Sequence, residues 1–314
     1  MYDRSDYVVL NGQLLSPEDI HVSPFDAGLL HGAGLFETLR ACNKVPLNLA
    51  DHLARLTESG KCFGMDIHLD TAIIADWLTE LLEANALDNA RIRMTVTRGD
   101  TRDALNADAT APTVLLSVVP FQPYPAVLYE KGMTVIISRF AQNPRGPLTG
   151  HKSTSYLDRL IALREARAAQ AGEALWFTHP DRYLAEGCVS NVFLVMADQQ
   201  IATPPWLYTA ETSLPEHNTG DGLLLPRLAL PGITRQHILR LCTRQGLPVT
   251  EKMLTIHDVL AAREIILTNA IMGVMPVTHI ERHAVGDETP GPVARRLSQW
   301  YNEFIQEQSH GSNA

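Results

Sequence analysis

The chain has 314 residues, of which 45% are hydrophobic and 19% are charged, and its formal net charge is −9 at pH 7. This length indicates two domains, or one large domain with a lobe, and this composition suffices to bury a sizeable core. The negative charge argues against a nucleic-acid-binding surface. The longest apolar runs, such as VLLSVV from Val114 to Val119, are too short to cross a bilayer, so we expect no membrane partner.

The N-terminal sequence and the cysteines indicate the cellular compartment that we expect for the protein. The N-terminal sequence MYDRSDYVVL lacks the apolar region of a secretory signal. The four cysteines are scattered without a CxxC pair, which is typical of reduced thiols in a cytoplasmic protein. The twelve histidines show no HExxH or paired spacing, so we expect no metal site.

The N-terminal half predicts helices mixed with an antiparallel sheet. A hairpin is expected from Tyr7 to Leu15 around the turn Asn11-Gly12. Apolar spacing predicts helices at Asn48–Phe63, with Asn48 as the cap, and at Thr71–Ala86. Strands are expected at Ala90–Thr97, Thr113–Val119 and Met133–Ser138.

The C-terminal half begins after a segment rich in Pro and Gly, AQNPRGPLTG at residues 141–150, which is the best candidate for a linker. We expect helices at Ser155–Ala169, Thr234–Gln245 and Val293–Glu307. Strands are expected at Ala174–Thr178, Tyr183–Glu186 and Asn191–Val195, forming a meander, and at Glu264–Asn269 and Met275–Ile280. The mixture lacks regular alternation, which disfavours a Rossmann or TIM architecture. The expected domains are residues 1–140 and 151–314, joined by 141–150.

Two residues point to the chemistry of the chain. Lys152 lies in HKSTSYLDRL, just after the linker, and Glu186 lies in YLAEGCVSN. A lysine can form a Schiff base with an aldehyde cofactor, and a carboxylate can hold a pyridinium nitrogen protonated, so together they suggest pyridoxal phosphate chemistry. Taken singly, Lys152 would be a solvated surface lysine and Glu186 an exposed hairpin carboxylate.

Four motifs in order strengthen this interpretation. They are LLHGAGLFETLR, HLARL, HKSTSYLD with YLAEGCVSNVF, and LPGITR with LTNAIMGVMPV. With them the chain resembles the class IV aminotransferases, the pyridoxal phosphate enzymes of fold type IV, from about Val8 to Ile280. This group includes branched-chain and D-amino acid aminotransferases and aminodeoxychorismate lyases. The resemblance implies an α/β (α+β) fold of two lobes with the cofactor between them, like D-amino acid aminotransferase, and a homodimer.

The resemblance also assigns cofactor residues. Lys152 is then the Schiff-base lysine and the general base and acid, and Glu186 binds the pyridine nitrogen. Arg55 in HLARL matches the arginine that binds the cofactor phosphate, although a helix partner for Glu58 is the simpler role. Ile233 and Thr234 open a helix whose first amides suit a phosphate, although a plain helix start fits equally well.

Three further positions depart from the motifs of the family. Tyr156 aligns with a tyrosine that contacts the phenolic oxygen of the cofactor, but stands one residue closer to the lysine, and a core tyrosine is an equal alternative. Asn269 and Ala270 stand where transaminases of the family carry Gly-Thr, so Asn269 and the Ala270 amide are expected near the phosphate. Thr268 supplies the missing hydroxyl only if the alignment shifts by one residue.

Substrate residues follow from a strand pattern and from the resemblance. Arg91 and Arg93 alternate on a strand and therefore point to the same face. Arg93 matches a substrate-side arginine of the branched-chain enzymes, which suits a carboxylate substrate; an ordinary surface arginine is the alternative. Thr38 in GLFETLR matches a threonine of the lyases, and His31 is expected either near the site or in a structural role.

These observations favour a pyridoxal phosphate-dependent transaminase acting on an amino acid or amine with a 2-oxo acid acceptor. Tyr156 and the two arginines support it. The alternative is aminodeoxychorismate lyase, supported by Thr38 and NAIMGVMPV. A non-catalytic binding protein with the same fold is a third hypothesis, against which the set of Lys152, Glu186 and Arg55 argues. An extra segment between Pro204 and Leu225 fits neither enzyme template.

Overall fold

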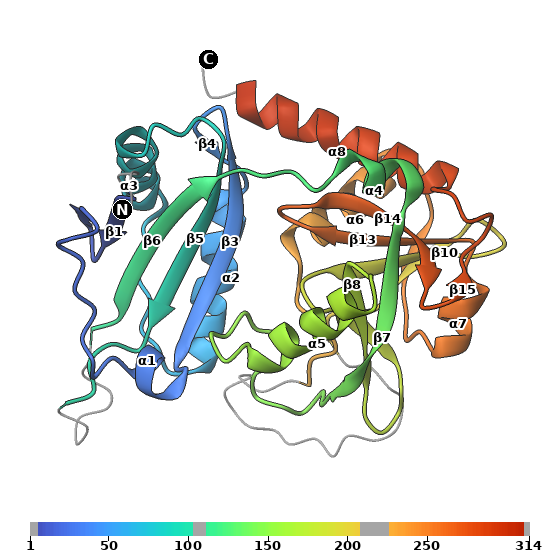
Figure 1. Cartoon of the computed structure of the whole chain (residues 1–314), viewed down its shortest axis with the longest axis horizontal. Coiled ribbons are helices and arrows are strands. Elements are labelled where there is room, and N and C mark those ends of the chain that lie inside the picture. Colours follow the sequence, from blue (N-terminus) through green and yellow to red (C-terminus); the bar gives the residue numbers. More distant parts are fainter. Residues whose placement is uncertain (1–5, 103–110, 208–225, 311–314) are drawn as a thin grey trace. The chain divides into compact units, whose positions relative to one another are not determined.

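The computed structural model describes residues 6–102, 111–207 and 226–310. The chain divides into two compact units. Unit 1 comprises Met1–Gln122, His151–Ser155 and Ile305–Ala314, and unit 2 comprises Pro123–Gly150 and Tyr156–Phe304. Each unit contains a sheet and helices (Figure 1), as the predicted mixed α+β class requires.

The sheet of unit 1 has the strand order β2-β1-β6-β5-β3-β4 and is antiparallel throughout. Its strands are β1 (Val8–Leu10), β2 (Gln13–Leu15), β3 (Gly34–Cys42), β4 (Val45–Pro46), β5 (Ala90–Thr97) and β6 (Thr113–Pro120). The helices are α1 (Ala27–His31), α2 (Leu49–Cys62) and α3 (Thr71–Ala84). The predicted hairpin is confirmed: Asn11 and Gly12 both have positive φ, which a tight turn of this kind requires.

The two faces of this sheet have different surroundings. Leu39 and Ile92 are opposite each other on β3 and β5, are fully buried and belong to the core that α2 and α3 complete. The intervening side chains of the same strands lie on the other face, because successive residues of a strand point to opposite sides. That second face carries Thr38 and Arg93, which are also directly opposite each other.

Unit 2 is built on a mixed sheet with the order β12-β11-β10-β13-β14-β7-β8-β9 and with β15 paired to β14. Its strands are β7 (Met133–Gln142), β8 (Glu173–Thr178), β9 (Leu184–Gly187), β10 (Asn191–Val195), β11 (Ile201–Thr203), β12 (Val249–Glu251), β13 (Glu264–Asn269), β14 (Gly273–Ile280) and β15 (His283–Ala284). Its helices are α4 (Ala126–Lys131), α5 (Leu157–Ala168), α6 (Ile233–Arg244) and α7 (Ile256–Ala261). The last helix, α8, spans Pro292–His310 and ends the described chain.

Three features differ from the sequence-based expectations. The expected meander of three strands is wrong, because β9 pairs with β8 while β10 pairs with β11 and β13. The division of the chain also differs from the expected boundary at residue 140, since β7 pairs with β8 and β14 in unit 2. The central strand β3 was not expected at all, because its hydrophobic and polar residues do not alternate cleanly in GLFETLRAC.

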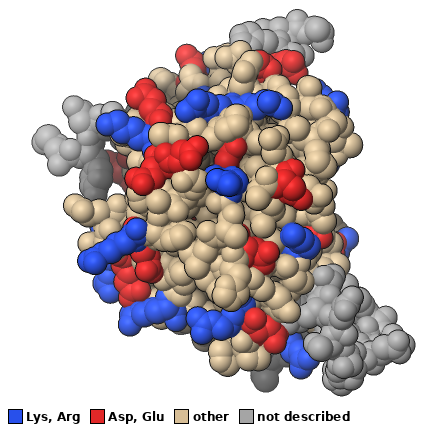
Figure 2. Space-filling model, turned by 90° about the vertical axis from the view of Figure 1, so that its right-hand side faces the viewer, with Lys and Arg blue, Asp and Glu red and all other residues tan. Residues whose placement is uncertain are grey.

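Within the described residues, no helix is both long and apolar enough to cross a membrane. No disulfide joins the four cysteines, all of which lie in the described residues, and Cys188 and Cys242 are buried. On the face shown in Figure 2, basic and acidic side chains are interspersed, and those drawn in colour form no large patch of one sign.

Candidate active site

The backbone around Lys152 adds to the edge of β3 in unit 1. The Lys152 carbonyl accepts a hydrogen bond from the Phe36 amide at 2.8 Å, and the Thr154 amide donates to the Gly34 carbonyl at 2.8 Å. A bridge between Leu35 and Ser153 lies between these two bonds. This pairing fixes the backbone from which the lysine side chain projects.

The amine of Lys152 lies above an aromatic ring that a second cation also contacts. Lys152 Nζ is 4.4 Å from the centroid of the Phe36 ring. The guanidinium carbon of Arg93 is 3.5 Å from the same centroid, and Arg93 Nε donates to Thr95 Oγ1 at 3.3 Å. Phe36 is only 3% exposed, so both cations cover it. The structure therefore brings the predicted Schiff-base lysine and the predicted carboxylate-binding arginine together on one ring.

The other predicted substrate residues are placed differently. Thr38 is half-buried and lies opposite Arg93, on the same face of the sheet. Arg91 is on this face too, but it is exposed and lies opposite Arg40. His31 is the exposed last residue of α1.

Arg55 projects from α2 toward a buried carboxylate on β3. Its Nε and Nη2 donate to Glu37 Oε1 and Oε2 at 2.8 and 2.6 Å, a two-pronged ion pair. His52 Nδ1 lies 2.8 Å from Glu37 Oε2. The predicted alternative partner, Glu58, instead lies near Lys61 on the surface at 3.8 Å. The pair with Glu37 orients the guanidinium of Arg55.

Burial and charge determine the protonation of this cluster. Burial opposes the charge of Glu37, but Arg55 and a hydrogen bond from His52 outweigh it and hold the pKa of Glu37 well below its usual range. Burial also lowers the pKa of His52, and the positive charges of Arg55 and Lys152 act in the same direction, against the attraction of Glu37. At neutral pH, Glu37 is therefore ionised and His52 is neutral.

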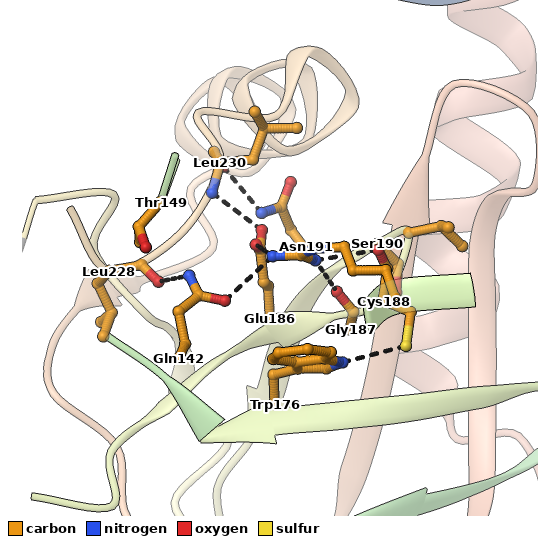
Figure 3. A network of polar contacts seen from close by, with 12 residues as sticks. Gln142, Thr149, Trp176, Glu186, Gly187, Cys188, Ser190, Asn191, Leu228 and Leu230 are labelled. Atoms are coloured by element: carbon orange, nitrogen blue, oxygen red, sulfur yellow. Dashed lines mark hydrogen bonds and ion pairs between the residues drawn. The ribbon is translucent and has the colours of Figure 1, made fainter. Parts of the chain in front are cut away.

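In unit 2, Glu186 is the centre of a polar network (Figure 3). The carboxylate is 4% exposed and lies on β9. Its Oε1 accepts from Arg159 Nη2 at 2.6 Å, and its Oε2 accepts from the Leu230 amide at 2.9 Å. Figure 3 shows the Glu186 side chain directed toward Leu230, with Gln142 on one side and Asn191 on the other. The exposed hairpin carboxylate that the sequence allowed is therefore wrong for Glu186.

Tyr156 lies at the cap of α5 and faces the turn that follows Glu186. Its hydroxyl donates to the Cys188 carbonyl at 2.8 Å. Burial raises the pKa of Tyr156, and the negative charge of Glu186 adds to this effect, while Arg159 opposes it. The phenol is therefore protonated at neutral pH and acts as a hydrogen-bond donor.

The first turn of α6 has the features of an anion site. Gly232 is the N-cap residue of α6 and has no side chain that could bond the first amides of the helix. Ile233 and Thr234, the next two residues, are both buried. A side chain at Gly232 would collide with Asn191, whose Oδ1 lies 1.8 Å from the position of a Cβ. The Thr234 hydroxyl is 3.3 Å from that of Tyr301. Glycine thus allows Asn191 to approach the helix where its backbone amides begin.

The predicted second phosphate loop is a turn that the Asn269 side chain closes. Asn269 Oδ1 accepts from the amides of Ile271 and Met272, and its Nδ2 donates to the Val189 carbonyl at 3.0 Å. Ala270 lies in the turn that these bonds close. Thr268 is 1% exposed, and its hydroxyl is buried with no hydrogen-bond partner among the described residues.

The partners in these networks were not evident from the sequence. Glu37 lies in the motif GLFETLR, but nothing indicated its bonds to Arg55 and His52. Arg159, which binds Glu186, was not singled out. Glu173 is fully buried and accepts hydrogen bonds from three amides and the Ser190 hydroxyl, which fixes the turn after Glu186. These contacts gave no signal because the paired residues are distant in sequence. Within the described part of the chain, no group of His, Cys, Asp and Glu residues fits a metal ion.

Comparison with known proteins identifies the family. The family model "Amino-transferase class IV" matches residues 34–280. A putative branched-chain-amino-acid aminotransferase of Methanocaldococcus jannaschii is 30% identical over 95% of this chain and 96% of its own length. An aminodeoxychorismate lyase of Bacillus subtilis is 28% identical over 96% of each chain. The crystal structure of the Escherichia coli branched-chain amino acid aminotransferase superposes with a TM-score of 0.84 at 25% identity, covering 98% and 97% of the two chains.

The chain therefore belongs to the class IV aminotransferase family and has the two-lobed fold of type IV. This family uses pyridoxal 5'-phosphate, so the predicted cofactor and enzyme class are confirmed.

Proposed function

We propose that this class IV aminotransferase transfers the amino group of an amino acid to a 2-oxo acid, with Lys152 as the catalytic residue and Arg93 as the residue that binds a substrate carboxylate. The observation that carries the proposal is the contact of both cations with the Phe36 ring. An amino acid carries its reacting carbon one bond from its carboxylate. A proton-transferring amine and a carboxylate-binding guanidinium on one ring suit that arrangement.

The polar groups of the chain fit pyridoxal phosphate. Lys152 offers a half-buried amine, and Arg55 offers a guanidinium held in place by Glu37. The Glu186 carboxylate accepts one bond on each oxygen, although each oxygen has two lone pairs, so it can still accept a bond from a ring N–H. The uncapped start of α6, with Thr234, suits a phosphate.

In this proposal each residue has a defined task. When bound, pyridoxal phosphate supplies an electron sink that acidifies the α-hydrogen of the amino substrate. Lys152 would remove that proton from the substrate Cα and donate it as an acid at the cofactor C4′. Glu186 would hold a proton on the ring nitrogen, and Arg55 and the first amides of α6 would bind the phosphate. The Tyr156 hydroxyl donates its single proton to the Cys188 carbonyl, so it would have to turn that donor to bind the phenolic oxygen.

The alternative reaction is that of an aminodeoxychorismate lyase. Thr38 supports it, because its side chain lies directly opposite Arg93 and thus beside the proposed substrate carboxylate. The similarity to the lyase of Bacillus subtilis supports it as well. Transamination remains the main proposal, because a simple amino acid offers both an α-hydrogen for Lys152 and a carboxylate for Arg93.

One assay separates the two reactions. The purified enzyme is incubated with L- and D-amino acids, (R)-amines and aminodeoxychorismate, each with and without a 2-oxo acid acceptor, and products are followed by absorbance and chromatography. We expect a 2-oxo acid and an aminated acceptor from an amino acid, and neither with Lys152→Ala. Formation of pyruvate and 4-aminobenzoate without an acceptor would establish the lyase instead.

We also propose that the enzyme acts as a homodimer in the cytoplasm. The scattered cysteines, two of them buried and none joined to another by a disulfide, support the compartment. Large exposed leucines support a subunit contact, among them Leu157 and Leu160 on α5, with 69% and 55% exposure.

A further inference from the structure

Arg159 is the closest partner of Glu186, and no motif of the sequence pointed to it. Its Nη2 donates to Glu186 Oε1 at 2.6 Å. The same nitrogen donates to Gln142 Oε1 at 3.0 Å, and Nη1 donates to the carbonyls of Gly187 and Cys188, both at 3.0 Å. The guanidinium thus joins the carboxylate to the backbone turn that follows it.

The guanidinium is rigidly held. Its central carbon lies 5.1 Å from the centroid of the Trp176 ring, and Gln142, which accepts from it, is itself fixed by a bond to the Leu228 carbonyl at 2.7 Å. Only 18% of the Arg159 side chain is exposed, and 5% of the Glu186 side chain. A buried pair in this geometry keeps one arrangement, because every alternative leaves a charge without a partner.

The pair places a guanidinium against the Glu186 carboxylate before any cofactor arrives. A carboxylate buried in this way without a cation would favour its neutral form. An adjacent guanidinium reverses that preference, and the Leu230 amide fixes the second oxygen. The remaining lone pairs then belong to an ionised and oriented carboxylate.

We propose that Arg159 is a positioning residue that keeps Glu186 ionised and oriented for the ring nitrogen of the cofactor. Arg159 itself touches neither substrate nor cofactor in this proposal. The inference rests on the role that the proposed function gives to Glu186, and its test separates the two.

The first measurement uses the protein without cofactor. Glutamate is labelled with ¹³C at the carboxyl carbon, and the Glu186 signal is assigned by its loss in Glu186→Gln. At pH 7 we expect the Glu186 carboxyl signal to move in Arg159→Gln toward that of a protonated carboxyl, because an adjacent positive charge and its hydrogen bond are lost. Arg159→Lys should move the signal less, because the charge remains while the planar guanidinium is lost.

The control is an arginine–glutamate pair of equal length elsewhere in unit 2. Arg139 Nη2 lies 2.6 Å from Glu165 Oε1, with 69% of the Arg139 side chain exposed. Arg139→Gln should leave the Glu186 carboxyl signal unchanged. A Glu186 signal at the same position in the wild type and in Arg159→Gln overturns the inference. If Arg159→Gln does not fold, an unchanged signal in Arg159→Met, which also removes the charge, overturns it equally.

The second measurement uses enzyme loaded with pyridoxal phosphate labelled with ¹⁵N in the ring. We expect the ring ¹⁵N signal to shift in Arg159→Gln and not in Arg139→Gln, while the ³¹P signal of the phosphate stays constant in both. A general structural disturbance would move both signals, which contradicts a positioning role. If the Glu186 carboxyl signal moves as expected but the ring signal stays constant even in Glu186→Gln, the assignment of Glu186 to the ring nitrogen is wrong, while the pairing with Arg159 is supported.

Discussion

At the scale of single residues, Phe36 explains why Arg93 and Arg91 differ although they alternate on the same strand. Both arginines point to the same face of β5, as their spacing predicted. Arg93 is half-buried against Phe36, which Lys152 also contacts, whereas Arg91 is exposed and lies opposite Arg40. The two arginines therefore form a matched pair for mutation.

Arg93→Ala should weaken carboxylate substrates much more than neutral amines. Loss of a charge-assisted contact to a carboxylate costs about 2–5 kcal/mol, which corresponds to a few decades in kcat/KM. The measurement compares kcat/KM for an amino acid and for an amine. Arg91→Ala, the control, should change both by less than about tenfold. Equal losses for the two substrate classes in Arg93→Ala would assign Arg93 to the fold or the cofactor.

Glu37→Gln should destabilise the protein by about 3–5 kcal/mol at pH 7, because it leaves Arg55 without its buried counter-charge. The folded-state pKa of Glu37 is depressed, so its contribution is present above the ordinary carboxyl pKa and is lost as the pH falls through the folded value. Urea unfolding should show a constant deficit from pH 7 to about pH 5 that shrinks below about pH 4.

The control for this change is Glu58→Gln on the same helix as Arg55. Glu58 is 64% exposed and lies 3.8 Å from Lys61, so its loss should cost less than about 1 kcal/mol. The buried pair of Arg55 and Glu37 would be contradicted if both variants lost a similar free energy of unfolding, or if the loss in Glu37→Gln did not depend on pH.

At the scale of elements, the start of α6 depends on an unusually close approach. Asn191 on β10 donates from its Nδ2 to the Leu230 carbonyl at 2.9 Å, while its Oδ1 occupies the space where a Gly232 side chain would be. The strand therefore sets the position of the first helical amides. The sequence predicted both elements nearly to the residue, but gave no sign of this contact between them.

Gly232→Ala should displace the start of α6 and weaken binding of pyridoxal phosphate by at least about tenfold, since the added methyl group collides with Asn191. Equilibrium dialysis measures the affinity. The double variant Gly232→Ala, Asn191→Ala is the control, and it should bind no worse than Asn191→Ala alone, because the collision is then removed. An additive loss in the double variant would argue against the collision as the cause.

At the scale of the whole molecule, two leucines of α5 expose large apolar side chains next to each other, which suggests a contact with a second subunit. Leu157 and Leu160 are three residues apart on one helix, so they lie on the same face. Isolated exposed leucines are ordinary in soluble proteins, whereas neighbouring ones are typical of a subunit contact. Among the described residues, these two leucines are therefore the best positions at which to test the proposed homodimer by mutation.

Leu160→Glu should shift the enzyme from dimer to monomer at micromolar concentration, because a charge in an apolar contact is costly. Sedimentation velocity gives the mass of the species. Leu260→Glu is the control on α7, where Leu260 is 40% exposed, and it should leave the mass unchanged. A wild-type protein that sediments as a monomer would contradict the proposed homodimer itself.

The sequence alone determined the family, the cofactor and most helices and strands. These depend on local information: the four motifs, the apolar periodicity and the turn Asn11-Gly12. It also predicted the roles of Lys152, Arg55 and Glu186, because their neighbours in sequence carry the resemblance. The extra segment up to Leu225 lies largely outside the described residues, which stop at residue 207 and resume at 226.

Only the tertiary structure decided which residues share a surface. The partners of the predicted site residues, Glu37 for Arg55 and Arg159 for Glu186, are 18 and 27 positions away in sequence. The pairing of β7 with β8 and β14, which displaced the expected domain boundary, is equally non-local. The physical reason is the same in each case: periodicity and propensity act over a few residues, whereas a buried charge or a strand edge finds its partner through the fold.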